Sequence, residues 1–195
     1  MTLIVIIKIL AIIILLLLSA LSSGSETALT AVSKQRAHRQ KDKGAKNANF
    51  ILKIKEFKDE FITGILLANN LFNILATALM TELLVSEFGG LGVSVATIFM
   101  TLMIVIFSEV TPKIFAINKP MTFALKVSKF FYFYTKLIKP IVNLINKVSN
   151  KIIKLIGLNL NADQSKIIEE EFEGAVQLQK QYSKDGEYEA DYMSN

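Results

Sequence analysis

Three long apolar segments, each interrupted by a short polar sequence, constrain this chain more than any other feature. The first covers about residues 3–22 and is almost pure Ile and Leu between residues 9 and 18. The second and third cover about residues 61–85 and 93–117. Each is close to the ~20 apolar residues that a helix needs to cross a bilayer. The predicted fold class is therefore an all-α integral membrane protein with three transmembrane helices.

The first apolar segment has one alternative interpretation, a secretory signal peptide cleaved after Ala20. No basic region precedes the apolar run, and the run is longer than the apolar part of most signal peptides. Lys8 fits a membrane span, because a long lysine side chain can reach the membrane surface. We interpret the segment as a span.

The distribution of charge predicts how the spans are oriented. Basic residues dominate the loop after the first span, and residues 86–90 between the second and third spans contain no Lys or Arg. Because cytoplasmic loops are enriched in Lys and Arg, the N-terminus is expected outside and the C-terminus in the cytoplasm, in the cell (inner) membrane. The basic run is expected to face anionic lipid and not nucleic acid. Its members are Lys34, Arg36, Arg39, Lys41, Lys43, Lys46, Lys53, Lys55 and Lys58.

Amphipathic helices are expected beside the spans. Apolar residues recur at helical spacing at positions 50, 51, 54 and 57, and residues 121–158 mix aromatic and aliphatic residues with regularly spaced lysines. This pattern favours juxtamembrane helices in the membrane interface, broken or kinked at Pro140. A fourth span over residues 130–156 is the alternative, although it would have to accommodate several lysines.

The end of the chain has a different character. Asp163 is expected to cap a helix that continues through Glu171, and Asp185-Gly186 is expected to form a turn. The predicted organisation is a transmembrane domain over residues 1–160 and a short, acidic, cytosolic helical segment over residues 161–195.

Polar residues inside the apolar segments mark candidate functional positions. Ser19 and Ser23 are four residues apart, as are Asn69 and Asn73, so each pair projects from one face of a helix. Glu109 precedes Pro112, which removes a backbone donor and leaves upstream carbonyl groups without a partner. One such pair alone would indicate helix packing. Three coincident polar sequences with a carboxylate favour an ion or substrate pathway, because polar groups are costly in a membrane.

The residue types restrict the ion and the chemistry. Hydroxyl, amide and carboxylate oxygens suit Mg²⁺, Ca²⁺ or Na⁺ and do not suit zinc or copper. The chain has no Cys, and its single histidine, His38, lies in the basic run. A serine nucleophile would therefore have no nearby base, and we do not expect an enzyme. Gly24 is expected to permit a helix break at the end of the first span.

The three polar sequences together resemble the transmembrane domain of the CorC / cyclin M (CNNM) family of magnesium transporters, also labelled hemolysin C-like. The resemblance rests on Ser-Ala-Leu-Ser-Ser-Gly-Ser-Glu-Thr-Ala-Leu at residues 19–29, Ala-Asn-Asn-Leu-Phe-Asn at 68–73 and Ser-Glu-Val-Thr-Pro-Lys at 108–113. Two departures are Ala68 and Ser108, where the family pattern has glycine. The resemblance covers about residues 3–158.

The resemblance implies a homodimer with a central Mg²⁺ site and Mg²⁺ efflux coupled to Na⁺. It implies Mg²⁺ ligands at Ser19, Ser23, Asn69, Asn73, Ser108 (through its carbonyl) and Glu109. Gly24 and Pro112 are expected, from their effect on the backbone, to have structural or gating roles. Paired cystathionine-β-synthase-type modules would begin after Asn195, so no nucleotide site is expected in these residues. The alternative function is a Mg²⁺-sensing membrane regulator or scaffold that modulates another transporter. A pore-forming hemolysin is not favoured, because the spans follow a positive-inside pattern.

Overall fold

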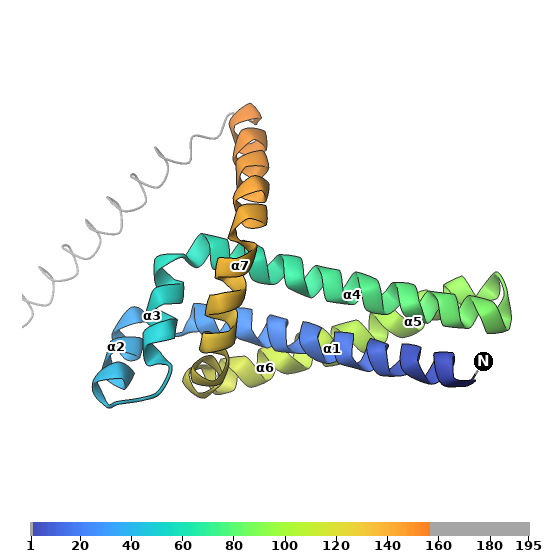
Figure 1. Ribbon diagram of the computed structural model, residues 1–195, viewed down its shortest axis with the longest axis horizontal. Coiled ribbons are helices and arrows are strands. Elements are labelled where there is room, and N and C mark those ends of the chain that lie inside the picture. The colour runs from blue at the N-terminus through green and yellow to red at the C-terminus, as the bar shows by residue number, and fades with distance from the viewer. Residues whose placement is uncertain (1, 157–195) are drawn as a thin grey trace, which may run out of the picture. The chain divides into compact units, whose positions relative to one another are not determined.

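The computed structural model describes residues 2–156, all of them in helices or short connections. The chain divides into two compact units after Asn146, and the first unit contains the candidate site. The expected helix from Asp163 and the turn at Asp185-Gly186 lie outside the described residues. The helices are α1 (Thr2–Ala31), α2 (Lys34–Asp42), α3 (Ala48–Glu56), α4 (Lys58–Phe88), α5 (Leu91–Met103), the π-helix η1 (Ile104–Val110), α6 (Thr111–Asn118) and α7 (Pro120–Leu155) (Figure 1).

Three of the described helical segments are long and apolar enough to cross a membrane. They are Leu3–Ala31, Lys58–Phe88 and Leu91–Asn118, the last combining α5, η1 and α6. Each contains one of the segments predicted from hydropathy, so the prediction of three membrane-spanning helices is confirmed. Only a minority of the side chains of these helices are buried within the chain, as expected where lipid and not protein surrounds an apolar helix.

The first span does not break at Gly24, and that prediction was wrong. Helix α1 continues without interruption to Ala31. Gly24 is buried against the aromatic ring of Phe123 from α7, and a Cβ built on it would lie 2.9 Å from Phe123 Cζ. The absence of a side chain at Gly24 therefore allows α7 to approach α1 closely, and the packing holds the helix where local propensity suggested a break.

The packing of α1 joins the three spans. It runs beside α4 and also contacts η1 and α6 (Figure 1). One small apolar cluster contains Ile12 of α1, Ala76 of α4 and Met100 of α5. A larger cluster contains Ala28 of α1 and Ile65 of α4, together with residues of α3 and α7. The polar residues of α1 and α4 lie between these two clusters along both helices, so apolar contacts hold the helices together on either side of them.

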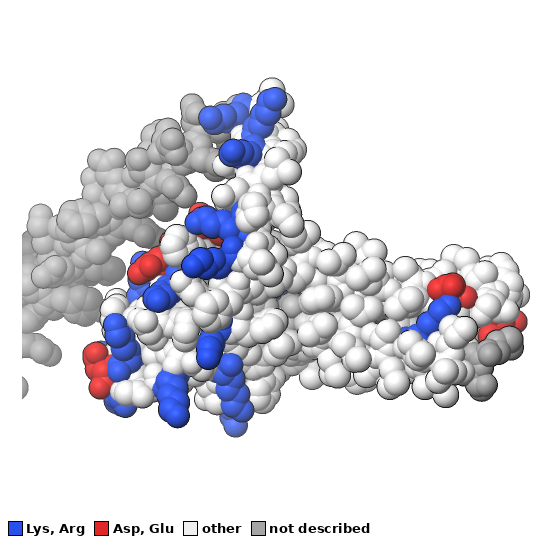
Figure 2. All heavy atoms as spheres, viewed as in Figure 1, with Lys and Arg blue, Asp and Glu red and all other residues white. Residues whose placement is uncertain are grey.

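The remaining helices pack against the end of α1 and the beginning of α4. Ile51 and Ile54 of α3 are buried as the helical spacing predicted, whereas Phe57 ends α3 and is exposed. Asn47, in the left-handed conformation before α3, donates a hydrogen bond through Nδ2 to the Leu125 carbonyl of α7. Figure 2 shows basic side chains gathered over α2, α3 and the first part of α7, while the visible surface along the spans carries few charges.

Helix α7 continues through Pro140, so of the break or kink expected at this proline the break does not occur. It is not among the described helices that are apolar enough to span a membrane, which favours the juxtamembrane interpretation over a fourth span. Its hydrogen bonds tie it to α4. Tyr134 donates to the Gly64 carbonyl at 3.2 Å, and Thr63 Oγ1 donates to Asn146 Oδ1 at 2.9 Å.

Candidate intramembrane ion site

A cluster of oxygen atoms lies where α1 and α4 pack together. The Ser19 hydroxyl is 2.5 Å from Asn69 Oδ1 and 2.7 Å from Asn73 Oδ1. Ser19 is fully buried, and Asn69 is 9 % exposed. The spacing of four residues in α4 places both amides on the face that meets Ser19, as the sequence predicted. Three predicted site residues, separated by about fifty positions in the chain, therefore converge.

The hydrogen bonds within this cluster are incomplete. Ser19 has one hydroxyl proton, so it can satisfy only one of the two amide oxygens at a time. The other oxygen faces a lone pair on Ser19 Oγ, an arrangement that a cation among the oxygens would stabilise. Rotation of one amide, which would direct its Nδ2 toward Ser19, is the way to satisfy the cluster without an ion.

Ser23 is the second indication of a ligand. Its side chain is 1 % exposed, and its Oγ is a buried polar atom without a hydrogen-bond partner among the described residues. Neighbouring serines differ, since Ser22 donates to the Leu18 carbonyl and Ser25 to the Leu21 carbonyl within α1. A buried hydroxyl without a partner is destabilising by about 1–3 kcal/mol, so such a group calls for a specific explanation. An oxygen-seeking cation would supply the missing partner.

The third polar sequence forms the π-helix η1. The N–H of Thr111 donates to the carbonyl of Ile106, five residues earlier. Pro112 follows in the first turn of α6 and cannot donate to the carbonyl of Ser108. Departures of this kind occur often at functional sites, because they leave backbone groups available and make a helix adaptable. The disturbance expected at Pro112 is thus present as a π-helical segment.

The side chains of η1 differ in how closely they approach α1. Ser108 is fully buried and donates to the Leu16 carbonyl at 3.2 Å, which joins η1 to α1 one turn before Ser19. Glu109 is partly buried, and no hydrogen bond or ion pair from its carboxylate occurs within residues 2–156. The structure therefore brings together Ser19, Asn69 and Asn73 directly and places Ser108 against the same helix. It shows no direct contact of Ser23 or Glu109 with the cluster.

The donor set fits a hard cation. Within the described residues, no group of three or more His, Cys, Asp or Glu side chains could hold a metal. An ion here would be held by hydroxyl and amide oxygens, with Glu109 as the nearest carboxylate in η1. Such oxygen ligands suit Mg²⁺, Ca²⁺ or Na⁺, and the scarcity of charge favours an ion that is bound and released over one held permanently.

Sequence comparison identifies the family. Residues 10–190 match the family described as the Cyclin M transmembrane N-terminal domain (CNNM). The chain belongs to this family. Membership of this family agrees with the resemblance of the three polar sequences, and it is consistent with a membrane transporter or regulator.

Curated relatives agree with this assignment. The chain is 33 % identical over 152 residues to a UPF0053 protein of Haemophilus influenzae, covering 78 % of this chain and 36 % of the relative. It is 31 % identical over 134 residues to the UPF0053 inner membrane protein YfjD of Escherichia coli, covering 69 % of this chain and 31 % of YfjD. A putative chloroplastic DUF21 domain-containing protein of Arabidopsis thaliana is 31 % identical over 134 residues, covering 69 % of this chain and 20 % of the relative. The chain thus spans about a third or less of the length of these relatives.

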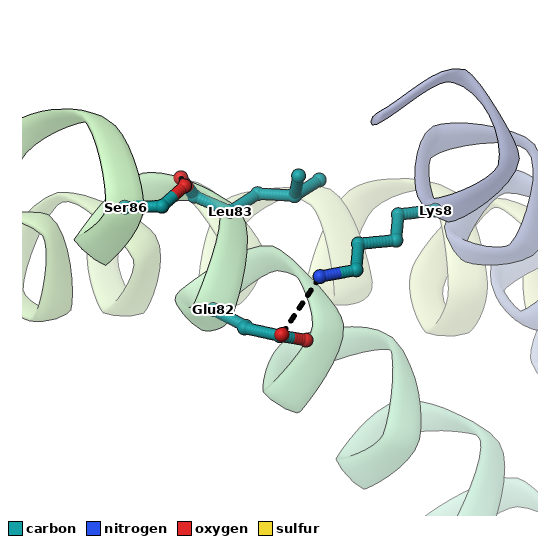
Figure 3. Close-up of polar contacts among 4 residues, drawn as sticks. All are labelled: Lys8, Glu82, Leu83 and Ser86. Atoms are coloured by element: carbon teal, nitrogen blue, oxygen red, sulfur yellow. Dashed lines mark hydrogen bonds and ion pairs between the residues drawn. The ribbon is translucent and has the colours of Figure 1, made fainter. Parts of the chain in front are cut away.

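Sequence reasoning missed one ion pair in the CNNM domain. Lys8 Nζ of α1 lies 2.7 Å from Glu82 Oε1 of α4 (Figure 3). Lys8 was predicted only to reach the membrane surface, without a partner. The sequence did contain a signal for this pair. Lys8 and Glu82 are isolated charges of opposite sign, and each lies near the predicted outer end of its span. Thr77 was also missed, although it continues the four-residue spacing of Asn69 and Asn73.

Proposed function

We propose that this domain binds Mg²⁺ between α1, α4 and η1 and moves it across the membrane. The observation that supports the proposal most strongly is the convergence of the Ser19, Asn69 and Asn73 oxygens. Four residues along α1, the buried hydroxyl of Ser23 has no hydrogen-bond partner among the described residues. Membership of the CNNM family agrees with a membrane transporter or regulator. Following the family resemblance, we further propose a homodimer, export from the cytoplasm and coupling to Na⁺.

Each proposed ligand has a distinct role. The two asparagine amides offer neutral oxygens and can rotate. An amide can direct its oxygen toward a bound ion, and its Nδ2 toward Ser19 when the site is empty. Ser19 and Ser23 add hydroxyl oxygens whose protons can turn away from a cation. Glu109 supplies negative charge, which offsets part of the cost of removing water from Mg²⁺. Neutral ligands with one carboxylate bind the ion without preventing its release.

Movement of the ion requires one helix group to shift against another. Segment η1 is suited to such a shift, because its backbone already departs from α-helical hydrogen bonding and contacts α1 through Ser108. A change between π- and α-helical geometry would rotate Ser108 and Glu109 relative to Ser19. The carboxylate would then approach or leave the oxygen cluster, and the site would gain or lose its charge.

A Mg²⁺-sensing regulator is the second candidate function. The chain covers only about a third of the two bacterial relatives, and the same oxygen cluster could report Mg²⁺ to other parts of a longer protein. A sensor would bind the ion at the cluster but would not carry it across the membrane.

Mg²⁺ flux into liposomes containing the purified chain distinguishes the two functions. Wild type is expected to carry Mg²⁺, and Glu109→Gln is expected to lower both binding and flux about tenfold or more, because it removes a charged ligand. Glu87→Gln is the matched control, since Glu87 is an exposed carboxylate at the end of α4. Its flux should equal that of wild type.

Three outcomes of the flux experiment distinguish transport, sensing and failure of the proposed site. Flux in wild type that requires Glu109 supports transport. Absence of flux, with Mg²⁺-dependent thermal stabilisation that Glu109→Gln removes, supports the sensor. Equal flux in wild type and Glu109→Gln would refute the proposed ion site.

A further inference from the structure

A groove of about 710 Å³ begins at the oxygen cluster and follows α4 away from it. The groove is broad and open, and half of its lining residues are apolar: Ile74, Ala78 and Val85 of α4 and Ile104 of η1. Its polar lining consists of Asn73, Thr77, Thr81 and Glu82. Asn73 also contacts Ser19, so the groove is continuous with the proposed ion site. At 1.5 Å per residue, Asn73 and Glu82 are separated by roughly 13 Å along the helix.

The two threonine hydroxyls in the groove can offer oxygen lone pairs to a ligand but have no free proton to donate to it. Thr77 Oγ1 donates to the Asn73 carbonyl, and Thr81 Oγ1 donates to the Thr77 carbonyl, both at 2.8 Å. These protons are committed to the backbone, so the remaining lone pairs of each oxygen are available to a ligand in the groove. Successive oxygens lie one helical turn apart, a spacing of roughly 6 Å. The stripe therefore offers stepwise oxygen contacts along α4.

The far end of the groove carries the Lys8–Glu82 ion pair. Figure 3 shows the Lys8 side chain reaching from α1 to the Glu82 carboxylate on α4. The Lys8 side chain is 24 % exposed and that of Glu82 is 63 % exposed. Lys8 is the only charged residue among the first 25 positions of the chain, and Glu82 is the only one between positions 61 and 86. Charges this isolated in apolar helices mark a pathway more often than a packing contact.

We propose that Glu82 and Thr81 form a second, transient site for a divalent cation, at the end of a path that runs along Thr77 to the ion site at Asn73. In the absence of the cation, the Lys8 ammonium pairs with the Glu82 carboxylate and closes this end of the path. An arriving divalent cation displaces Lys8 because it carries twice the charge and coordinates the hydroxyl oxygen as well. This inference rests on the proposed function, because it concerns the route to the same ion site.

A test of the groove uses the absence of cysteine from the chain. Thr77→Cys and Thr81→Cys are treated, in the reconstituted chain, with a positively charged, membrane-impermeant thiol reagent. Leu75→Cys is the control, because Leu75 is 43 % exposed on α4 but does not line the groove. Both threonine positions are expected to react and Leu75→Cys is not, since a thiol in lipid stays protonated. Failure of both threonine positions to react would show that lipid or a second copy of the chain fills the groove, and would overturn the proposal.

The cation site is tested in the same variants by adding Mg²⁺. Mg²⁺ is expected to slow the reaction at Thr77→Cys, which lines the groove and leaves both Thr81 and Glu82 in place, and Glu82→Gln is expected to abolish this protection. Lys8→Met, or Lys8→Gln if the first variant does not fold, is expected to speed the reaction about fivefold by removing the closing ion pair. A groove that reacts without Mg²⁺ protection, or protection that persists in Glu82→Gln, would overturn the proposal.

These readouts do not depend on flux. If Mg²⁺ still stabilises Glu82→Gln against heat through the Glu109-dependent site, loss of protection at Thr77→Cys in that background is assigned to the second site. If Thr77→Cys with Glu82 intact is protected by Mg²⁺ but the wild-type chain shows no flux, transport fails as the proposed function while the second cation site stands.

Discussion

Replacing Ser23 with alanine should stabilise the ion-free protein and weaken its binding of Mg²⁺. The Ser23 hydroxyl is buried without a partner, and such a group costs about 1–3 kcal/mol. Removing it should therefore raise the free energy of unfolding by about 1 kcal/mol, which corresponds to about 2–4 °C in melting temperature for a chain of this size. Thermal unfolding of purified protein in detergent with a chelator present measures this gain.

The same substitution removes one proposed ligand of Mg²⁺. A tenfold loss of affinity corresponds to about 1.4 kcal/mol. At a Mg²⁺ concentration about one hundred times the wild-type Kd, bound ion stabilises wild type by about 2.7 kcal/mol. The variant, with tenfold weaker affinity, should gain only about 1.4 kcal/mol under these conditions. The variant should therefore be about 1 kcal/mol more stable than wild type without the ion and about as stable as wild type with it, because its Mg²⁺-dependent gain is about 1.3 kcal/mol smaller.

Ser22→Ala is the matched control for Ser23→Ala. Ser22 is equally buried and neighbours Ser23, but its hydroxyl donates to the Leu18 carbonyl at 2.9 Å. This variant loses a hydrogen bond, so it should lose about 0.5–1.5 kcal/mol without the ion and respond to Mg²⁺ as wild type does. The reasoning would be refuted if Ser23→Ala were destabilised as much as Ser22→Ala and kept the wild-type response to Mg²⁺.

Two further predictions concern packing and pH. A Cβ on Gly92 would overlap the backbone carbonyl of Leu84, so Gly92→Ala should lower the free energy of unfolding by about 1–3 kcal/mol. In Gly64→Ala the closest contact of the new Cβ is the flexible end of Ile138 at 2.7 Å, so this variant should lower the free energy of unfolding by less than about 1 kcal/mol. Equal melting temperatures of the two variants would contradict this prediction. Burial raises the pKa of the Tyr134 hydroxyl above its ordinary value of 10.0. Above about pH 10 the unfolded chain loses this proton first, so the stabilising effect of Tyr134 should decline as pH rises through the raised pKa. Tyr134→Phe should cost about 1 kcal/mol at neutral pH and unfold with a shallower alkaline pH dependence, and identical pH profiles would count against it.

The membrane spans and the helical faces of the polar pairs were predictable because both depend on local sequence. Hydropathy over about twenty residues is sufficient to identify a span, and a spacing of four residues is sufficient to place Asn69 and Asn73 on one face. The family resemblance followed from short motifs of the same kind. The helix break at Gly24 was wrongly predicted, because local propensity did not include the packing of Phe123 against that glycine.

What the sequence determined by itself was the number of spans, their order and the identity of the polar side chains within them. The tertiary structure decided which of these side chains meet. Ser19, Ser22, Ser23 and Ser25 are alike in sequence, yet one reaches across to α4, two bond to their own helix and one has no partner. The pairing of Lys8 with Glu82 likewise depends on how far α1 and α4 slide along each other. Apolar helix surfaces are nearly uniform in hydropathy, so only the fit of specific side chains between helices fixes that register and, with it, the proposed ion path.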